Sequence, residues 1–317
     1  MEYEGQICRS PMERGSFMLP IMVGCSYNKC KFCNLFKSLK YRELQIEQIE
    51  NELLRVRNIG GAPKKIFLGD GSAFDSETMR LTAILRLIKT YFPNCKEINM
   101  DATIMGILKK SNEELELLYN LGVRHLYIGI ESGLDDVLKF MKKDHDIREA
   151  YDGLKRIKEI GYFFDAHIMT GIAGKDRGIE NAYALANFFN KTHPSRIINF
   201  SMFLHKEVEL FNDIRNRKYM PSDELSNLKE EECLIEQLSL IKQNIEYEGF
   251  HDYIEFRVRG KLPKDKHKML FSLKEKIAFY SQQEPIYAVV SGECSINTLK
   301  KENEKAVWIT YTHILTK

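Results

Sequence analysis

The sequence predicts an α/β fold, a partial and open (β/α)6 barrel followed by a C-terminal α+β extension. Apolar runs of strand length alternate with helical patterns from residue 17 to about residue 203, which is typical of a parallel sheet with helices outside. About six such units occur, fewer than the eight of a closed barrel. Since the alternation loosens afterwards, we assign residues 1–203 to the core and residues 204–317 to an extension that covers the barrel and shapes the substrate site.

The strands expected in the core are short apolar runs that end at turn residues. The first of them stops at Gly24 and has the pattern of a buried strand. The six expected strands span residues 17–23, 65–68, 97–101, 123–130, 162–169 and 196–202. Barrels of this kind carry their chemistry at the carboxyl ends of the strands, so the residues that follow each strand are the candidates for a site.

Segments with helical spacing separate these strands. The first helical pattern stops at Gly60 and Gly61, and the second is closed by Pro93. The core helices are expected at residues 44–59, 79–91, 112–121, 135–141, 147–160 and 179–190. For the extension we expect an irregular segment at 207–229, helices at 230–247 and 265–282, and strands at 253–258, 286–290 and 306–313.

Composition limits the classes of protein to which the chain can belong. Its 317 residues are 44% hydrophobic and 29% charged, as is usual for a globular domain with a sizeable core. The formal net charge of +2 argues against nucleic acid or a membrane as partner. No apolar run approaches the ~20 residues that span a bilayer, and residues 1–5 do not resemble a signal peptide. We therefore expect a cytoplasmic protein.

Three of the seven cysteines lie close together, directly after the first expected strand. They are Cys25, Cys30 and Cys33, and the odd total argues against a disulfide framework. A structural zinc site uses four ligands, usually as two pairs, and no second pair follows at a suitable spacing. Three thiolates on one loop suit a [4Fe–4S] cluster whose fourth iron stays open, because ordinary ferredoxin clusters use four cysteines. A zinc site completed by a distant residue is the alternative.

The cysteine loop resembles the cluster-binding loop of the radical S-adenosylmethionine (SAM) superfamily, in which an aromatic residue such as Phe32 precedes the last cysteine. The first gap holds four residues where the usual spacing has three. Residues 3–11 are similar to the start of a bacterial branch that also has the longer gap, and the resemblance extends over at least residues 3–203. It implies that the cofactors are a [4Fe–4S] cluster and SAM, and that a flavodoxin or ferredoxin type of protein donates one electron.

The resemblance also implies which residues bind SAM. Glycines beside Asp70 allow a close backbone approach after the second strand. Glu131 ends the fourth strand, where a carboxylate suits ribose hydroxyls or an ammonium group, and its alternative role is to cap the next helix. Arg42 and Arg148 are candidates for a forked contact with the SAM carboxylate. The full set of expected cofactor residues is Phe32, Gly69, Asp70, Gly71, Glu131, Ser132, Arg148, Ile168, Thr170 and Phe203.

In the superfamily, SAM is cleaved to methionine and a 5′-deoxyadenosyl radical, and here we expect the radical to attack a small molecule. No second cysteine cluster, cobalamin motif or RNA-binding appendage points to a peptide or a polynucleotide. Overall, the chain is similar to the queuine lyases, which implies cleavage of the C–N bond of queuine to release 7-aminomethyl-7-deazaguanine in the salvage of a tRNA modification.

The extension holds the candidate residues for substrate. A guanine-like edge needs carboxylates for its N–H groups, and Asp252, Glu255 and Glu293 are the candidates, while Cys294 is a candidate hydrogen donor to a substrate radical. Two alternatives stay open. One is another small-molecule radical SAM reaction, such as a decarboxylation or an epimerisation. The other is a non-catalytic iron–sulfur or heme chaperone.

Overall fold

The computed structural model describes residue 4, residues 8–239 and residues 244–290. The strand expected at 306–313 and the candidate residues Glu293 and Cys294 lie outside these ranges. The chain forms two compact units, each made of two segments. Unit 1 comprises residues 1–129 and 144–165, and unit 2 comprises residues 130–143 and 166–317.

Unit 1 is built on parallel strands in the order β1 (Phe17–Pro20), β4 (Lys65–Gly69), β5 (Glu97–Ala102) and β6 (Val123–Glu131), the last of which continues into unit 2. Leu19 pairs with Leu68, and Leu68 pairs with Met100, so the carboxyl ends of these strands meet at one edge. A small antiparallel hairpin of β2 (Met22–Val23) and β3 (Arg42–Glu43) follows β1. The hairpin encloses the cysteine loop, residues 24–41.

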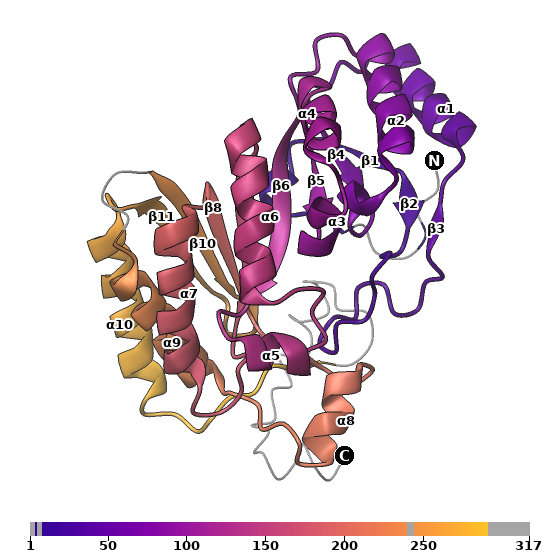
Figure 1. The fold of residues 1–317 in the computed structure, drawn as a ribbon. Helices are drawn as coiled ribbons and strands as arrows, with labels where there is room; N and C mark the ends of the chain where they lie inside the picture. The colour runs from indigo at the N-terminus through magenta and orange to yellow at the C-terminus, as the bar shows by residue number, and fades with distance from the viewer. Residues whose placement is uncertain (1–3, 5–7, 240–243, 291–317) are drawn as a thin grey trace. The chain divides into compact units, whose positions relative to one another are not determined.

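The helices of unit 1 cover its sheet because each has one apolar face (Figure 1). Their ends are set by local signals: Ser111 caps α4 and Asp146 caps α6, each in a reciprocal capping box with a glutamate three residues later. The helices are α1 (Ile46–Asn58), α2 (Thr78–Tyr91), α3 (Ile104–Leu108), α4 (Asn112–Asn120) and α6 (Ile147–Ile160), with short turns η1 (Pro11–Glu13) and η2 (Ala73–Asp75).

The sheet of unit 2 contains, in order, β7 (Phe163–Thr170), β8 (Arg196–Ser201), β10 (Ile245–His251) and β11 (Phe256–Leu262). The first residues of β7 belong to unit 1. β10 runs parallel to β8, with Gly249 opposite Asn199, and β11 is antiparallel to β10. Two further short strands, β9 (Leu204–His205) and β12 (Val289–Val290), pair in parallel. The sheet of unit 2 therefore includes two strands that the extension contributes.

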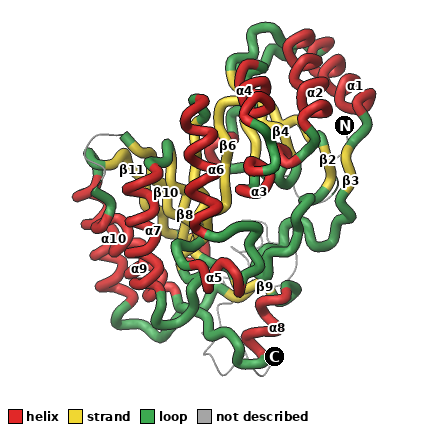
Figure 2. Tube along the Cα trace, viewed as in Figure 1, coloured by secondary structure: helices red, strands yellow, loops and turns green. Residues whose placement is uncertain are grey.

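Helices α7 (Gly178–Thr192), α9 (Glu224–Gln237) and α10 (Lys266–Tyr280) lie side by side in unit 2 (Figure 1). The unit also contains α5 (Asp135–Phe140), α8 (Glu209–Arg215) and the turn η3 (Asp252–Ile254). Figure 2 distinguishes these helices from the strands and from the loops that connect them. No helix in the part of the chain that the structure describes is long and apolar enough to cross a membrane.

The predicted fold class is confirmed: the chain has an α/β fold with a mostly parallel central sheet. The prediction of a helix at residues 230–247 is wrong. The helix there is α9, which begins earlier because the Asp223 side chain caps it by accepting from the Ser226 amide at 2.7 Å. Residues from Ile245 onwards form β10 instead, with burial that alternates from Ile245 to Gly249. The segment predicted as irregular, 207–229, contains α8 and the start of α9, and β11 begins at Phe256 and extends beyond the strand predicted at 253–258.

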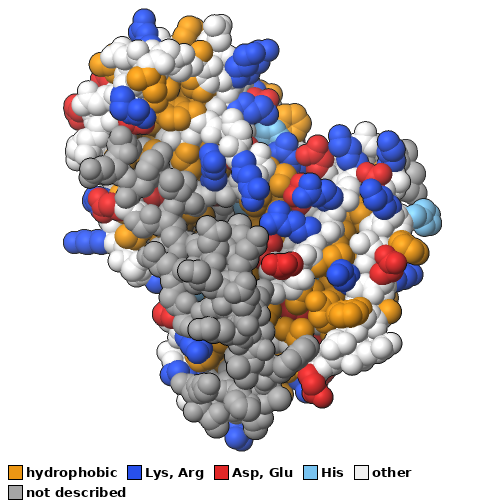
Figure 3. All heavy atoms as spheres, turned by 180° about the vertical axis from the view of Figure 1, so that it is seen from behind, with side chains coloured by type: hydrophobic (Ala, Val, Ile, Leu, Met, Phe, Trp, Pro, Cys, Tyr) orange, Lys and Arg blue, Asp and Glu red, His pale blue; other side chains and the backbone are white. Residues whose placement is uncertain are grey.

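Side chains of both charge signs lie on the surface. On the face drawn in Figure 3, Lys and Arg side chains lie among acidic and hydrophobic ones. The interiors of both units are apolar: Leu19, Phe67 and Leu68 are fully buried in unit 1, and Phe189 and Ile197 are fully buried in unit 2. Burial of such side chains supplies about 1.5–3 kcal/mol each.

Candidate active site

The cysteine loop of unit 1 holds its three thiols in half-buried positions. The loop is tied across its width, because Asn28 Nδ2 donates to the Phe36 carbonyl at 2.9 Å and Lys37 Nζ donates to the Asn28 carbonyl at 2.7 Å. Burial raises the pKa of the Cys33 thiol to about 11, and the nearby Cys30 and Cys25 thiols add to this rise while the Leu35 backbone opposes it. The three thiols therefore lie within electrostatic range of one another.

The turn after β4 packs against the first cysteine of this loop. A Cβ on Gly71 would lie 2.5 Å from the Gly24 carbonyl oxygen and 2.7 Å from Cys25 Cα, and Gly71 has a φ of +46°. Beside it, Ser72 Oγ lies 3.9 Å from Cys25 Sγ. Only glycine allows the two backbones to approach so closely. The predicted SAM-binding turn and the predicted cluster loop are thus in direct contact within unit 1.

Asp70, in the same turn, is buried with one oxygen unsatisfied. Its side chain is 3% exposed, and Oδ1 has no hydrogen-bond partner among the described residues. Burial raises the pKa of Asp70 to about 6. A buried polar atom without a partner costs roughly 1–3 kcal/mol, and a ligand that donates a hydrogen bond would recover that cost.

A cavity of about 500 Å³ in unit 1 opens next to Asp70. Two arginines that line it are already paired: Arg42 bonds to Glu4, and Arg55 bonds to Glu52 at 2.7 Å. Arg42, considered above for the SAM carboxylate, therefore lies in the same cavity as Asp70. Arg148 is exposed on α6 and does not line this cavity.

In unit 2, Glu131 ends β6 with a positive φ of 63° and pairs with Lys143, whose Nζ lies 3.6 Å from Glu131 Oε1. Both side chains are nearly buried, at 12% and 8% exposure. Burial, together with the Lys143 charge, lowers the pKa of the half-buried His167 to about 4, so this histidine is neutral at pH 7. The next helix, α5, has Leu134 at its N-cap and no side-chain hydrogen bond at that cap.

The remaining predicted SAM residues of unit 2 are mostly buried. Ser132 donates to Asn181 Oδ1 at 2.6 Å, and the buried Thr170 Oγ1 has no partner among the described residues. Ile168 is fully buried, whereas Phe203 is half-buried, with its ring 6.1 Å from that of His205. Ser132 follows β6, and Thr170 is the last residue of β7. Both are linked to α9 by hydrogen bonds, Ser132 through Asn181 and Thr170 through Asn199.

The two predicted substrate residues that the structure describes lie close together at η3. Asp252 pairs with Arg257 at 3.2 Å, which partly neutralises its charge. Glu255 ends the turn with a left-handed φ of 50°. These contacts leave the substrate roles of both residues as predictions.

The model of the family described as the radical SAM superfamily matches residues 19–186, more than half of the chain. The chain belongs to the radical SAM superfamily. Superfamily members use a [4Fe–4S] cluster and SAM, and these are the cofactors of this chain. The matched residues include the cysteine loop and every predicted SAM residue except Phe203.

Similarity to individual radical SAM proteins is low. The chain is 22% identical over 234 residues to the heme chaperone HemW of Bacillus subtilis, a match that covers 72% of this chain and 58% of the relative. It thus spans little more than half the length of that relative.

Two solved structures have a similar fold. The methyltransferase TsrM from Kitasatospora setae, with cobalamin and a [4Fe–4S] cluster bound, matches with a TM-score of 0.52 and 15% identity over 64% of this chain and 39% of that one. Methylornithine synthase matches with a TM-score of 0.52 and 14% identity over 87% and 71%.

The residues of unit 1 fit the radical SAM cofactors. Three thiols on one loop supply one ligand to each of three irons, and the unsatisfied Asp70 oxygen beside the loop offers an acceptor for a SAM ammonium group. Among the described residues no group of three or more His, Cys, Asp or Glu side chains could hold a single metal ion. A cluster differs from such a site because its cysteines bind separate irons.

Two residues near the radical SAM loop were missed by the sequence analysis. Burial raises the pKa of Cys8 well above its usual range, and Asp101, Cys33, Asp70 and Cys25 add to the rise, so this thiol lies near the cluster loop. Burial also raises the pKa of Asp101 to about 8. Asp101 lies near the carboxyl end of β5, and its position as the last residue of a predicted strand was a signal that could have identified it.

Proposed function

We propose that this chain is a radical SAM enzyme in which Cys25, Cys30 and Cys33 hold the cluster and a 5′-deoxyadenosyl radical attacks a small molecule. The observation that carries the proposal is the contact between the cysteine loop and the β4 turn, in which Gly71 touches the Cys25 backbone beside the unsatisfied Asp70. A pure carrier of a cluster does not need a buried acceptor at this position.

Each residue of unit 1 then has a role. The thiolates of the loop bind iron, and the Gly71 backbone keeps Cys25 at a fixed place. Asp70 accepts a hydrogen bond from the SAM ammonium group, which stabilises its own ionised form against the burial that raises its pKa. The bound cluster supplies the electron that cleaves SAM. The protein orients the cofactor and excludes water from the reacting atoms.

In unit 2, Glu131 is the proposed acceptor for the ribose hydroxyls or the ammonium group of SAM. Lys143 Nζ lies 3.6 Å from Glu131 Oε1 and places a positive charge beside this carboxylate. The neutral His167 nearby adds a polar side chain without a second positive charge. The turns after β6 and β7, with Ser132 and Thr170, complete the proposed contacts.

For the substrate we propose queuine, with cleavage of its C–N bond to release 7-aminomethyl-7-deazaguanine. The support is the overall resemblance of the chain to queuine lyases and an extension long enough to enclose one small ligand. Residues 204–317 would then shape the substrate site. Asp252, Glu255 and Glu293 are the carboxylates proposed for the N–H groups of the base, and Cys294 is the proposed hydrogen donor.

The test uses anaerobically reconstituted protein with SAM, dithionite and queuine, analysed by mass spectrometry. We expect 5′-deoxyadenosine and methionine in equal amounts, and deuterium from the cyclopentenediol ring of queuine in the 5′-deoxyadenosine. Replacing Cys25, Cys30 or Cys33 by Ala should abolish iron binding, while replacing Cys95 or Cys233 should not. Queuine that neither binds nor changes the rate of SAM cleavage would exclude the lyase, and cysteine variants that keep their iron would exclude the cluster assignment.

A heme chaperone is the second candidate, because the chain is similar to the heme chaperone HemW of Bacillus subtilis over 72% of its length. This function predicts that the purified protein binds heme, with a Soret band that shifts on binding. It also predicts that no small molecule stimulates SAM cleavage. Addition of heme and of queuine to the same reconstituted sample, in separate reactions, distinguishes the two candidates.

A further inference from the structure

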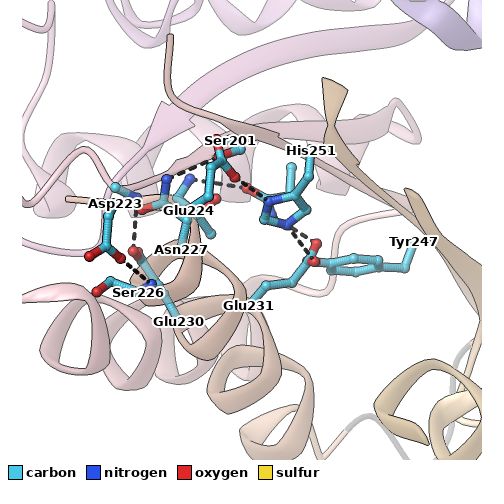
Figure 4. A network of polar contacts seen from close by, with 12 residues as sticks. Ser201, Asp223, Glu224, Ser226, Asn227, Glu230, Glu231, Tyr247 and His251 are labelled. Carbon is cyan, nitrogen blue, oxygen red and sulfur yellow. Dashed lines mark hydrogen bonds and ion pairs between the residues drawn. The ribbon is translucent and has the colours of Figure 1, made fainter. Parts of the chain in front are cut away.

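A network of buried polar side chains connects α9 to β8 and β10 in unit 2 (Figure 4). α9 presents Glu224, Asn227, Glu230 and Glu231 from one face, at intervals of three, three and one. All four are at most 2% exposed. Buried carboxylates are costly unless hydrogen bonds satisfy them, so their partners indicate what the helix holds in place.

Glu230 holds two turns with one carboxylate. Its Oε2 accepts from the Gly171 amide at 2.8 Å, and its Oε1 accepts from Asn181 Nδ2 at 2.7 Å. Asn181 Oδ1 in turn accepts from Ser132 Oγ at 2.6 Å and from the Gly133 amide at 3.0 Å. The turn after β7 is thus held directly, and the turn after β6 is held through a single amide side chain.

Gly171 is fixed from several sides. Its carbonyl accepts from the Tyr219 hydroxyl at 2.7 Å, while its N–H donates to Glu230. A Cβ at this position would lie 2.6 Å from Asn227 Oδ1, and Gly171 has a φ of +87°. The turn after β7 therefore has little freedom to move without breaking contacts to α9.

Glu231 carries the rest of the network and reaches the turns only indirectly. It accepts from Tyr247 and from Asn199 at 2.8 Å each, and it pairs with His251 at 3.0 Å (Figure 4). Asn199 Oδ1 accepts from the Thr170 amide at 3.1 Å. Tyr247 donates to the same oxygen, Glu231 Oε1, as Asn199 does, and its hydrogen bond to Glu231 reaches neither turn directly.

We infer that Glu230 is a positioning residue for SAM, which fixes the turns after β6 and β7 through Gly171 and Asn181 without touching the cofactor. The inference rests on the proposed function, in which these two turns contact SAM. The helix α9, which belongs to the extension, would then set the shape of the cofactor site. The Glu230 carboxylate can hold both turns because each of its two oxygens accepts a hydrogen bond from a separate donor. An apolar side chain of equal size would pack as well but would leave Gly171 N–H and Asn181 unsatisfied.

The variant Glu230→Gln tests the inference at almost constant side-chain volume. It replaces one acceptor by an NH2 group, which faces a donor whether it points to Gly171 or to Asn181. We expect the Kd for SAM to rise by about tenfold, with the iron content unchanged and with kcat at saturating SAM reduced much less than kcat/KM. The matched control is Tyr247→Phe, which removes one buried hydrogen bond to Glu231 from the same network without removing a direct bond to either turn.

The outcomes distinguish a role of Glu230 in positioning the turns that bind SAM from a general contribution of Glu230 to the stability of the fold. An unchanged Kd in Glu230→Gln, or an equal loss in Glu230→Gln and Tyr247→Phe, would overturn the inference. If Glu230→Gln does not fold, Glu230→Asp keeps the charge but is too short to reach both donors, and a folded Glu230→Asp protein with wild-type SAM affinity overturns it equally. Wild-type protein that does not bind or cleave SAM contradicts the proposed function itself, which is a separate result.

Discussion

Gly71 and Gly60, two of the glycines of unit 1 that have positive φ values, differ in their surroundings. Gly71 lies against the Gly24 and Cys25 backbone, whereas a Cβ on Gly60, with a φ of +81°, would meet nothing within 4 Å. For any residue other than glycine, such a φ costs about 1 kcal/mol of conformational free energy. The steric clash with the cysteine loop is therefore an additional cost at Gly71 alone.

Gly71→Ala should displace the cysteine loop and lower the iron content after reconstitution, with loss of SAM cleavage. Gly60→Ala is the control, because it imposes a similar backbone strain without a clash. Iron and sulfide analysis of both variants checks the prediction. Equal, full iron content in the two proteins would mean that the β4 turn does not hold the loop.

Glu131→Ala should weaken SAM binding by about 1.5–3 kcal/mol, the usual cost of losing a charged hydrogen bond, with the cluster intact. Glu209→Ala is the control, because it removes an exposed pair with Lys142 at 2.7 Å. Isothermal titration of SAM into both reconstituted variants measures the difference. A SAM affinity that Glu131→Ala leaves unchanged would remove Glu131 from the proposed site.

At the scale of elements, the ion pairs of α9 with β10 make stability depend on pH. Burial alone lowers the pKa of His251, but Glu231 and Glu224, at 3.0 Å from its two ring nitrogens, raise it to about 10. A histidine whose pKa is raised by folding stabilises the protein fully below pH ~6.5, its unfolded pKa. That contribution is lost as the pH rises toward 10.

The free energy of unfolding of wild-type protein should therefore exceed that of His251→Gln by a few kcal/mol at pH 6, and the difference should narrow toward pH 10. Glu230, whose pKa burial raises to about 7, titrates in both proteins and contributes to both curves. Urea denaturation at several pH values measures the difference. A gap that is constant from pH 6 to pH 10 would show that His251 is not charged in the folded protein.

The elements also show why the sequence predicted some features and not others. The βα alternation of the core is a local pattern, and its strands and helices agree with the structure at most ends. The α9 and β10 assignments failed because apolar residues between 230 and 247 fit a helical spacing, although Asp223 with Ser226 marked the true start. The cysteines were found because they are adjacent in sequence, whereas the bond between Gly171 and Glu230 joins residues 59 positions apart.

At the scale of the whole molecule, the boundary predicted at residue 203 divides unit 2. The segment after it supplies β10, which pairs with β8, and α9, which satisfies Gly171, Asn181 and Asn199. Without that segment, three buried polar groups would lose their partners, at roughly 1–3 kcal/mol each.

Residues 1–203 alone should therefore fail to unfold cooperatively and should exchange their amide hydrogens rapidly in β7 and β8. The full chain is the reference, measured by hydrogen exchange and by thermal unfolding under the same conditions. A truncated protein that unfolds cooperatively would instead support residues 1–203 as a domain that folds on its own.

In the part of the chain that the structure describes, β11 is the last strand of its sheet, and its exposed positions carry Arg257, Arg259 and Lys261. A terminal strand offers unpaired backbone groups to any other extended chain, and a row of positive charges opposes such pairing by repulsion between copies. We therefore expect these side chains, on the strand that the extension adds to the sheet, to disfavour edge-to-edge association between copies of the chain.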